Sequence, residues 1–152
     1  MALQLATVAA TIAALHVDGL EIRDIDDIPA ESGLRGALLI PLPAYVTDFD
    51  VTRTSFGGAA AKVDVTYTLN YRLLFAAIGT DRALNLSVWG GMIEMVAAIW
   101  DAFLAIGVFD ADHDEVVDVV PLNPANMGIV NDPSDRAFYG CDLAFLVTEF
   151  VR

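Results

Sequence analysis

Residues 63–73 have the sequence VDVTYTLNYRL, in which apolar and polar side chains alternate without a break. A period of two is typical of a β-strand with one face on a core and the other in solvent or against a partner. Residues 47–56, TDFDVTRTSF, have the same character, and the segment between the two runs is rich in Gly and Ala. The pattern predicts a long antiparallel β-hairpin with a small, flexible tip, whose strands exceed the usual length of about five to six residues.

Residues 85–106 are predicted to form the main helix. Large apolar side chains recur along one stripe, which consists of Trp89, Met92, Ile93, Val96, Ile99, Trp100, Phe103 and Ile106. Ser87, Glu94 and Asp101 lie seven residues apart, hence on one narrow polar line. Because small residues fill the flanks, most of the circumference of this helix is expected to be covered. One small sheet does not easily provide that cover, so a neighbouring subunit is the expected second cover.

The rest of the chain is predicted to form shorter elements. Apolar residues at steps of three and four predict a helix over residues 3–15. Strands are expected at residues 20–24, 37–40, 116–120 and 138–150, with a turn-rich stretch at 122–135. Pro41 and Pro43 are expected to stop the strand that begins at residue 37. The order predicts a single α+β domain over residues 1–152, with a mainly antiparallel or mixed sheet on which two main helices pack.

The composition limits the function classes. Twenty-one acidic and eight basic side chains give a formal net charge of −13, and hydrophobic residues make up 56% of the chain. This content excludes a disordered chain. With a single lysine, Lys62, the chain lacks the basic clusters that neutralise phosphates, so non-specific nucleic-acid binding is not expected. The single cysteine, Cys141, cannot form an intramolecular disulfide and is expected to be a buried, unreactive thiol.

Neither a cleaved signal peptide nor a membrane span is expected. Residues 1–17 lack the basic region with which a signal peptide begins. No uninterrupted apolar stretch reaches the roughly 18–20 residues that cross a bilayer. The apolar run over residues 95–109 is broken by Asp101. The sequence therefore predicts a soluble protein.

Two ligand-binding motifs fail at key positions. Residues 110–121 begin like an EF-hand calcium loop, but Glu115 stands where glycine is required and Pro121 where a carboxylate is required. Residues 56–63 contain two glycines and Lys62, but not in the order of a phosphate-binding loop. These segments are expected to form a solvated acidic loop and a hairpin tip.

No catalytic or metal-binding set of residues is apparent in the sequence. His16 and His113 have no Cys, His or Glu at metal-ligand spacing, and no nucleophile motif accompanies them. Six aromatic residues are in phase with the apolar stripes and are expected in the core: Tyr67, Tyr71, Trp89, Trp100, Phe103 and Phe145. The sequence predicts a protein that is not an enzyme and that needs neither a cofactor nor a metal ion.

Five segments in order carry a resemblance to a known family. They are the N-terminal helix, residues 17–24 (VDGLEIRD), the hairpin of residues 49–56 and 63–72, the long helix and the closing strand at 138–150. Together they resemble the tail terminator, or tail completion, proteins of long-tailed bacteriophages, over nearly the whole chain. The resemblance implies an α/β domain that forms a hexameric ring on the end of the tail tube. There it stops tube polymerisation and presents the surface that joins the head, and no catalytic residues come with it.

The same resemblance implies the partners and the location. The partners are further copies of the chain, the tail tube protein and the head–tail connector or neck protein. The location is the virion, and the host cytoplasm during assembly. DNA would pass through the ring without specific binding, and an acidic lumen suits that passage because a basic one would hold phosphates. The candidate interface residues are Arg53, Phe56 and Lys62 on the hairpin and Glu94 and Asp101 on the long helix.

Two alternatives stay open. The chain could be another neck or head–tail connector component or a minor tail protein, since these also form rings without catalysis. It could instead be a small-ligand-binding or hydrolytic α+β domain. That class requires a pocket with convergent polar groups and a strongly perturbed ionisable residue.

Overall fold

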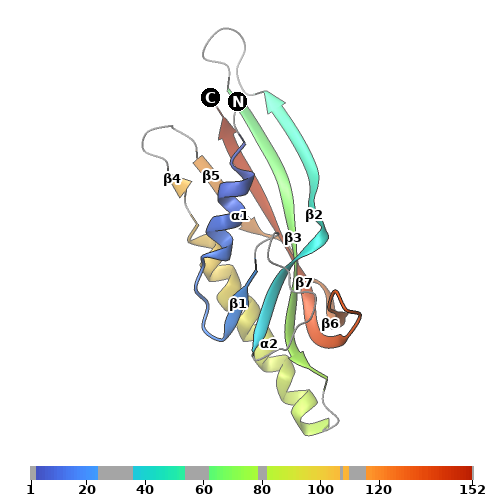
Figure 1. Ribbon diagram of the computed structural model, residues 1–152. Coiled ribbons are helices and arrows are strands. Elements are labelled where there is room, and N and C mark those ends of the chain that lie inside the picture. Colours follow the sequence, from blue (N-terminus) through green and yellow to red (C-terminus); the bar gives the residue numbers. More distant parts are fainter. Residues whose placement is uncertain are drawn as a thin grey trace.

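The computed structural model describes residues 3–23, 36–53, 62–78, 82–106, 108–109 and 116–151. Within these ranges two helices and seven strands follow one another (Figure 1). They are α1 (Leu5–Ala13), β1 (Leu20–Ile22), β2 (Ala37–Arg53), β3 (Val63–Ala77), α2 (Arg82–Leu104), β4 (Val108–Phe109), β5 (Val116–Pro121), β6 (Ala125–Asn131) and β7 (Ala137–Val151). The fold is of the α+β class, as expected.

The strands form one mixed sheet. Its order is β1-β2-β3-β7-β5-β4, and β6 also pairs with β7, next to the stretch that β5 occupies. The pair of β1 and β2 is parallel, whereas the other described pairs are antiparallel. The predicted hairpin of β2 and β3 is confirmed from Thr47 to Arg53. Its predicted tip, with Phe56, lies outside the described residues.

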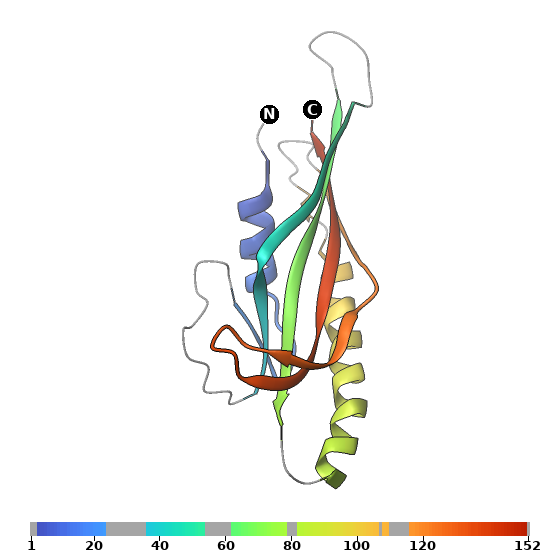
Figure 2. The same ribbon diagram turned by 90° about the vertical axis from the view of Figure 1, so that its right-hand side faces the viewer.

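Both helices lie on one face of the sheet, which we call the helix face (Figures 1 and 2). The apolar residues of β3 and β7 alternate onto this face and are buried there: Val65, Tyr67, Leu69, Tyr71, Leu73, Cys141, Leu143, Phe145 and Val147. Val8 and Ile12 of α1 join the same core. From α2, Phe103 stacks on Phe145 with ring centroids 3.8 Å apart. The predicted alternation of both strands is confirmed.

The opposite face, which we call the open face, carries the polar members of the same strands. At one end of this face the hairpin of β6 and β7 folds across the sheet (Figure 2). A second apolar cluster lies beneath it, formed by Leu38, Ile40, Leu74, Val130 and Phe138. β7 passes so close to β3 at Gly140 that an added Cβ would lie 1.8 Å from the Leu73 carbonyl oxygen. A residue without a side chain is therefore required at this crossing.

The prediction that Pro41 and Pro43 end a strand is wrong, because β2 continues through both to Arg53. β1 accompanies β2 only as far as Leu39, beyond which this side of β2 has no described neighbour. Proline is tolerated on such an edge, where a missing N–H costs no ladder bond. The pairing with β3 also shifts register between Pro41 and Val46. This bulge accommodates the prolines within one strand.

Two further strands were not predicted. β6 lies in the stretch expected to consist of turns, and the two-residue β4 follows α2. Asn126, with a φ of 51°, and Gly128, with a φ of 153°, fit a register shift in β6. Pairing with β7 thus forms the strand against the local turn signals. The expected acidic loop with His113 lies outside the described residues.

Candidate interaction surfaces

α2 buries only one side against the sheet. From residue 87 onward, its buried side chains are Met92, Val96, Ile99 and Phe103. Ile93, which belongs to the predicted apolar stripe, is 57% exposed, so the sheet of this chain does not cover it. Leu104 is 58% exposed. Ile93 follows Met92 by one residue, or about 100° around the helix, which turns it out of the contact with the sheet.

The exposed side of α2 carries apolar residues on both flanks of a line of carboxylates. Ala97 and Ala98 are exposed between Ile93 and Leu104, and exposed Ala105 directly follows Leu104. The predicted polar line of Ser87, Glu94 and Asp101 is exposed as well, which confirms its orientation. Of the window Ser87–Leu104, 22% is buried within the protein. We call this exposed side the α2 face.

By length and composition the segment Ser87–Leu104 is apolar enough to cross a membrane, with a mean hydropathy of 1.3. The sequence does not predict this segment as a membrane span, because Glu94 and Asp101 interrupt its apolar residues. Core helices of soluble proteins pass the same test. α2 differs from a fully enclosed core helix in how little of it is buried.

The hairpin end brings two of the predicted interface residues together. Arg53 ends β2 opposite Val63, and Lys62 directly precedes that residue. Both cations are exposed. This end of the hairpin lies far from α2 (Figure 1), so within one chain neither cation reaches Glu94 or Asp101.

Sequence reasoning missed two apolar residues near the same end. Phe49 and Val51 are 51% and 53% exposed. The Phe49 ring stacks on buried Tyr67, with centroids 5.9 Å apart. Alternation alone predicts that these side chains face a core. Their exposure follows from the position of β2 at the edge of the sheet.

The open face contains a fully paired arginine. Arg72 binds the carboxylate of Asp142 through Nε at 2.7 Å and Nη2 at 3.0 Å, and Asn126 donates a further hydrogen bond to the same carboxylate. Burial alone would raise the pKa of Asp142, but the hydrogen bonds from Arg72 and Asn126 lower it below the usual value. The hydrogen bond to Asp142 raises the pKa of Arg72, whereas burial acts to lower it. The group is a stable, neutral unit.

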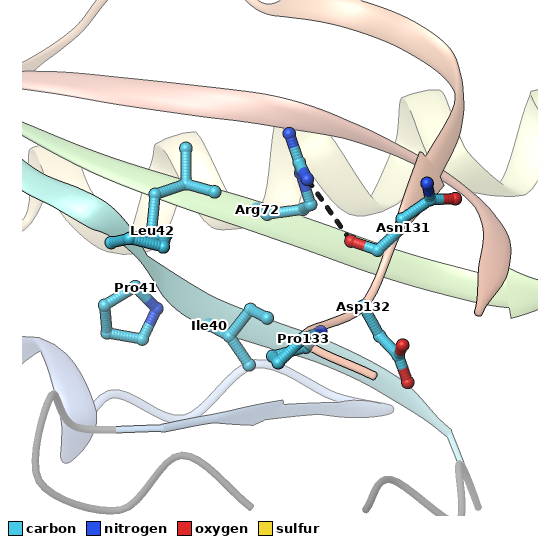
Figure 3. A pocket seen from close by; sticks show the side chains of 8 residues that line it. Ile40, Pro41, Leu42, Arg72, Asn131, Asp132 and Pro133 are labelled. Atoms are coloured by element: carbon cyan, nitrogen blue, oxygen red, sulfur yellow. Dashed lines mark hydrogen bonds between the residues drawn. The ribbon is translucent and has the colours of Figure 1, made fainter. Parts of the chain in front are cut away.

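A cavity of about 260 Å³ lies beside this arginine (Figure 3). Its lining consists of Ile40, Pro41, Leu42, Pro43, Arg72, Asn131, Asp132 and Pro133. Arg72 Nη1 donates to the Asn131 carbonyl oxygen across it, at 3.2 Å (Figure 3). Asp132 is held by the turn of β6 and β7, where it accepts the Arg136 N–H. The polar groups in the lining of the cavity therefore already take part in hydrogen bonds.

Two side chains with strongly raised pKa values, Tyr67 and Cys141, lie elsewhere, on the helix face. Buried Glu149 accepts hydrogen bonds at Oε1 from the Tyr67 hydroxyl and the Gln4 N–H, each at 2.9 Å. Its Oε2 is buried without a partner among the described atoms. Burial, and then Glu149, raise the pKa of Tyr67 well above its usual range. Burial raises the pKa of Cys141 to about 11, which agrees with the expected unreactive thiol.

These buried groups have structural roles. Gln4 precedes α1 and has no side-chain cap of its own, so the Glu149 carboxylate takes that place at the positive end of the helix.

No group of three or more His, Cys, Asp or Glu side chains that could hold a metal ion occurs among the described residues. His16 is exposed and contacts Asp18 at 3.0 Å. No protein-family model matches the chain, and no curated protein is significantly similar to it.

Proposed function

We propose that the chain is a structural virion protein of a long-tailed bacteriophage. It forms a ring at the end of the tail tube, hexameric as in the family it resembles, stops tube polymerisation and provides the head–tail joining surface. The observation that supports self-assembly best is the α2 face. It places Ile93 and Leu104, each more than half exposed, among small residues on a helix that the single chain covers only on one side.

A ring fits the distribution of exposed charge. A closed ring uses a heterologous contact, in which two different patches of neighbouring copies meet. The α2 face carries Glu94 and Asp101, and the hairpin end carries Arg53 and Lys62 on another part of the molecule. The small side chains of α2 allow close approach of a second backbone. In this proposal the hairpin end contacts either the neighbouring subunit or the tube.

A lipid bilayer suits the α2 face less well. Glu94 and Asp101 lie within the only candidate span among the described residues. A charged side chain at the centre of a bilayer costs roughly 2.5–3.5 kcal/mol on insertion scales. A protein partner can instead pair such carboxylates with cations.

The proposed partners and location are those that the family resemblance implies. The partners are further copies, the tail tube protein and a connector or neck protein, in the virion and, during assembly, in the host cytoplasm. Neither catalysis nor a cofactor is part of it. DNA passes without specific binding, in keeping with a net charge of −13. A connector or minor tail protein is the nearest alternative, because it would use the same surfaces.

The α2 contact is tested by Ile93→Arg. A buried, unpaired guanidinium at the centre of an interface should disrupt assembly, so sedimentation velocity should show protomers only. Asn123→Arg is the matched control, because Asn123 is exposed and outside both patches. Assembly that survives Ile93→Arg would contradict the use of the α2 face.

The hairpin contact is tested by Arg53→Glu. Charge reversal should weaken assembly and should do so most at low salt, where ionic contacts are least screened. If assembly persists unchanged at all salt concentrations, the hairpin end does not contact the neighbouring subunit.

The cavity beside Arg72 favours one other function, a small-ligand-binding domain. Its volume of about 260 Å³ lies just below the roughly 300–1,000 Å³ of typical ligand pockets. Its polar lining groups already bind one another, and the raised pKa values of Tyr67 and Cys141 belong to the other face of the sheet. The cavity therefore lacks the reactive group that a hydrolase requires.

A further inference from the structure

The open face has an apolar strip that the β6–β7 hairpin does not cover. Val120 of β5 pairs with Leu146 of β7, and both side chains lie on this face. Val120 is 40% exposed, Leu122 37% and Phe150 40%, and Leu146 is half-buried. The helices cannot cover these residues, because they pack on the other face (Figure 2). Exposed apolar residues at Val120 and Leu122 beside half-buried Leu146, with Phe150 beyond the Asp118–Thr148 row, are typical of a surface that binds another protein.

The cavity lies at one end of the same face. Arg72, in its lining, is on the row of the sheet formed with Asp142, two residues along from the row of Asn70 and Ala144. Its other walls come mainly from Ile40, Leu42 and three prolines. A volume of about 260 Å³ is small for a drug-sized ligand but large enough for one bulky apolar side chain. The Arg72–Asp142 pair is neutral overall, so the cavity has no preference for an anion.

The charge of the open face is negative. Glu21, opposite Leu38, and Asp132, in the cavity lining, each form an ion pair, with Arg23 and Arg136 respectively. Asp50, Asp64 and Asp118 are further acidic side chains of its strands. Asp50 and Asp118 flank one row of the sheet, with Thr66 and Thr148 between them. A partner that covers this face must therefore supply cations. A second copy suits this poorly, because it brings a net charge of −13.

The distance between the features indicates the conformation of the partner. Arg72 and Asp64 are eight residues apart on β3, which corresponds to about 27 Å at 3.4 Å per residue. A short peptide segment reaches both the cavity and the acidic residues only when it is extended, over about eight or nine residues.

We infer that the open face binds an extended segment of a partner protein that is both basic and apolar. One bulky apolar side chain of the segment occupies the cavity beside Arg72. Further apolar side chains lie over Val120 and Leu146, and lysine or arginine side chains lie near Asp64 and Asp118. This surface is distinct from the α2 face and borders the hairpin end at Asp64. Binding there does not depend on the α2 contact, so the inference stands whether or not the chain forms a ring.

The test uses three capped, fluorescein-labelled peptides of nine residues. They share the same Leu, Val and Thr positions and carry three Lys, three Gln or three Glu at the remaining ones. Fluorescence anisotropy with the full chain should show that the Lys peptide binds at least tenfold more tightly than the Gln peptide. The Glu peptide should show no binding. Equal binding of all three, or binding of none, would overturn the inference.

Variants locate the site. Asp64→Asn with Asp118→Asn should remove the preference for the Lys peptide. The control pair Asp18→Asn with Glu94→Gln removes the same charge from exposed positions outside the open face and should leave the preference intact. Equal effects of the two pairs would show a long-range charge effect and overturn the site. Melting temperatures near that of the wild type establish that the variants are folded.

The cavity is tested separately with Leu42→Trp, which fills it, and with Val120→Arg, which blocks the apolar strip. Both should weaken binding of the Lys peptide at least tenfold. Unchanged affinity in both would overturn the assignment of the open face. Light scattering on the same samples distinguishes a second copy as the occupant: the peptide would then dissociate a dimer, which would contradict the proposed partner. Ring assembly is scored in that measurement independently of peptide binding.

Discussion

At Gly140 the main chain of β7 lies against the Leu73 carbonyl of β3, and no side chain fits between them. Gly90, on the exposed side of α2, has no atom within 4 Å of an added Cβ. The two glycines thus occupy opposite environments. One is required by a close approach, whereas the other only lowers the intrinsic stability of a helix.

Gly140→Ala should therefore destabilise the protein by at least about 2 kcal/mol, because overpacking forces the strands apart. Gly90→Ala, the matched control, should stabilise it by about 0.5–1 kcal/mol, through higher helix propensity. Urea unfolding measures both. Equal effects of the two substitutions would contradict the described crossing of β7 and β3.

Glu149 connects the start of α1 to the core of the sheet. Glu149→Ala should lower the free energy of unfolding by about 2–4 kcal/mol, because it leaves the Tyr67 hydroxyl and the Gln4 N–H without their acceptor. Glu149→Gln keeps the accepting oxygen and should cost clearly less. Chemical denaturation compares the two. A larger loss for the Gln variant would contradict this hydrogen-bond arrangement.

The Arg72–Asp142 pair predicts a pH dependence. The pKa of Asp142 is lowered in the folded protein, so its stabilising effect is present above the unfolded-state pKa of about 3.9 and is lost as the pH falls through the folded-state value. Asp142→Asn should cost about 1–3 kcal/mol at pH 7. The difference from the wild type should shrink below about pH 4. A difference that does not change with pH would contradict the ion pair.

At the level of the elements, the bulge of β2 is held by the side chain of Asn70. The Asn70 amide donates to the carbonyl oxygens of Ala44 and Tyr45 and to Thr47 Oγ1, and so holds the bulge that follows Pro41 and Pro43. Asn70→Ala should lower stability by about 1–2 kcal/mol and speed amide exchange around residues 44–47. Asn123→Ala is the control. Unchanged exchange would show that the bulge holds without Asn70.

The elements that sequence could predict are those with an uninterrupted period. β3 and β7 alternate over their whole length, and the polar line of α2 keeps one orientation. The prediction ended a strand at Pro41, because the sequence does not show that this part of β2 lies at the edge of the sheet, where proline is tolerated. β6 was missed for a similar reason, since its pairing with β7 outweighs Asn126 and Gly128. The apolar stripe of α2 was too wide to show that Ile93, and not Met92, faces outward.

The candidate surfaces were predictable only in part. Glu94 and Asp101 follow from their spacing, and Arg53 and Lys62 from the two arms of the hairpin. The cavity beside Arg72 joins β2, β3 and the β6–β7 turn, which no local pattern connects. The acidic and apolar open face likewise results from register between strands that are distant in sequence.

For the whole molecule, three surfaces with different chemistry surround one core. The α2 face is apolar on both sides of an acidic line, the hairpin end carries two exposed cations, and the open face is apolar and acidic. Such a division suits a component of an assembly that contacts several neighbours. The central claim is that the α2 face makes this chain assemble with itself.

The most direct test is the solution mass of the unmodified chain, measured by light scattering over a wide concentration range at moderate and high salt. Repulsion between copies with a net charge of −13 weakens as salt is added, whereas apolar burial does not. A closed assembly of six times the 16.3 kDa protomer, retained at high salt, is the predicted result. A mass of one protomer under all conditions would contradict self-assembly through the α2 face.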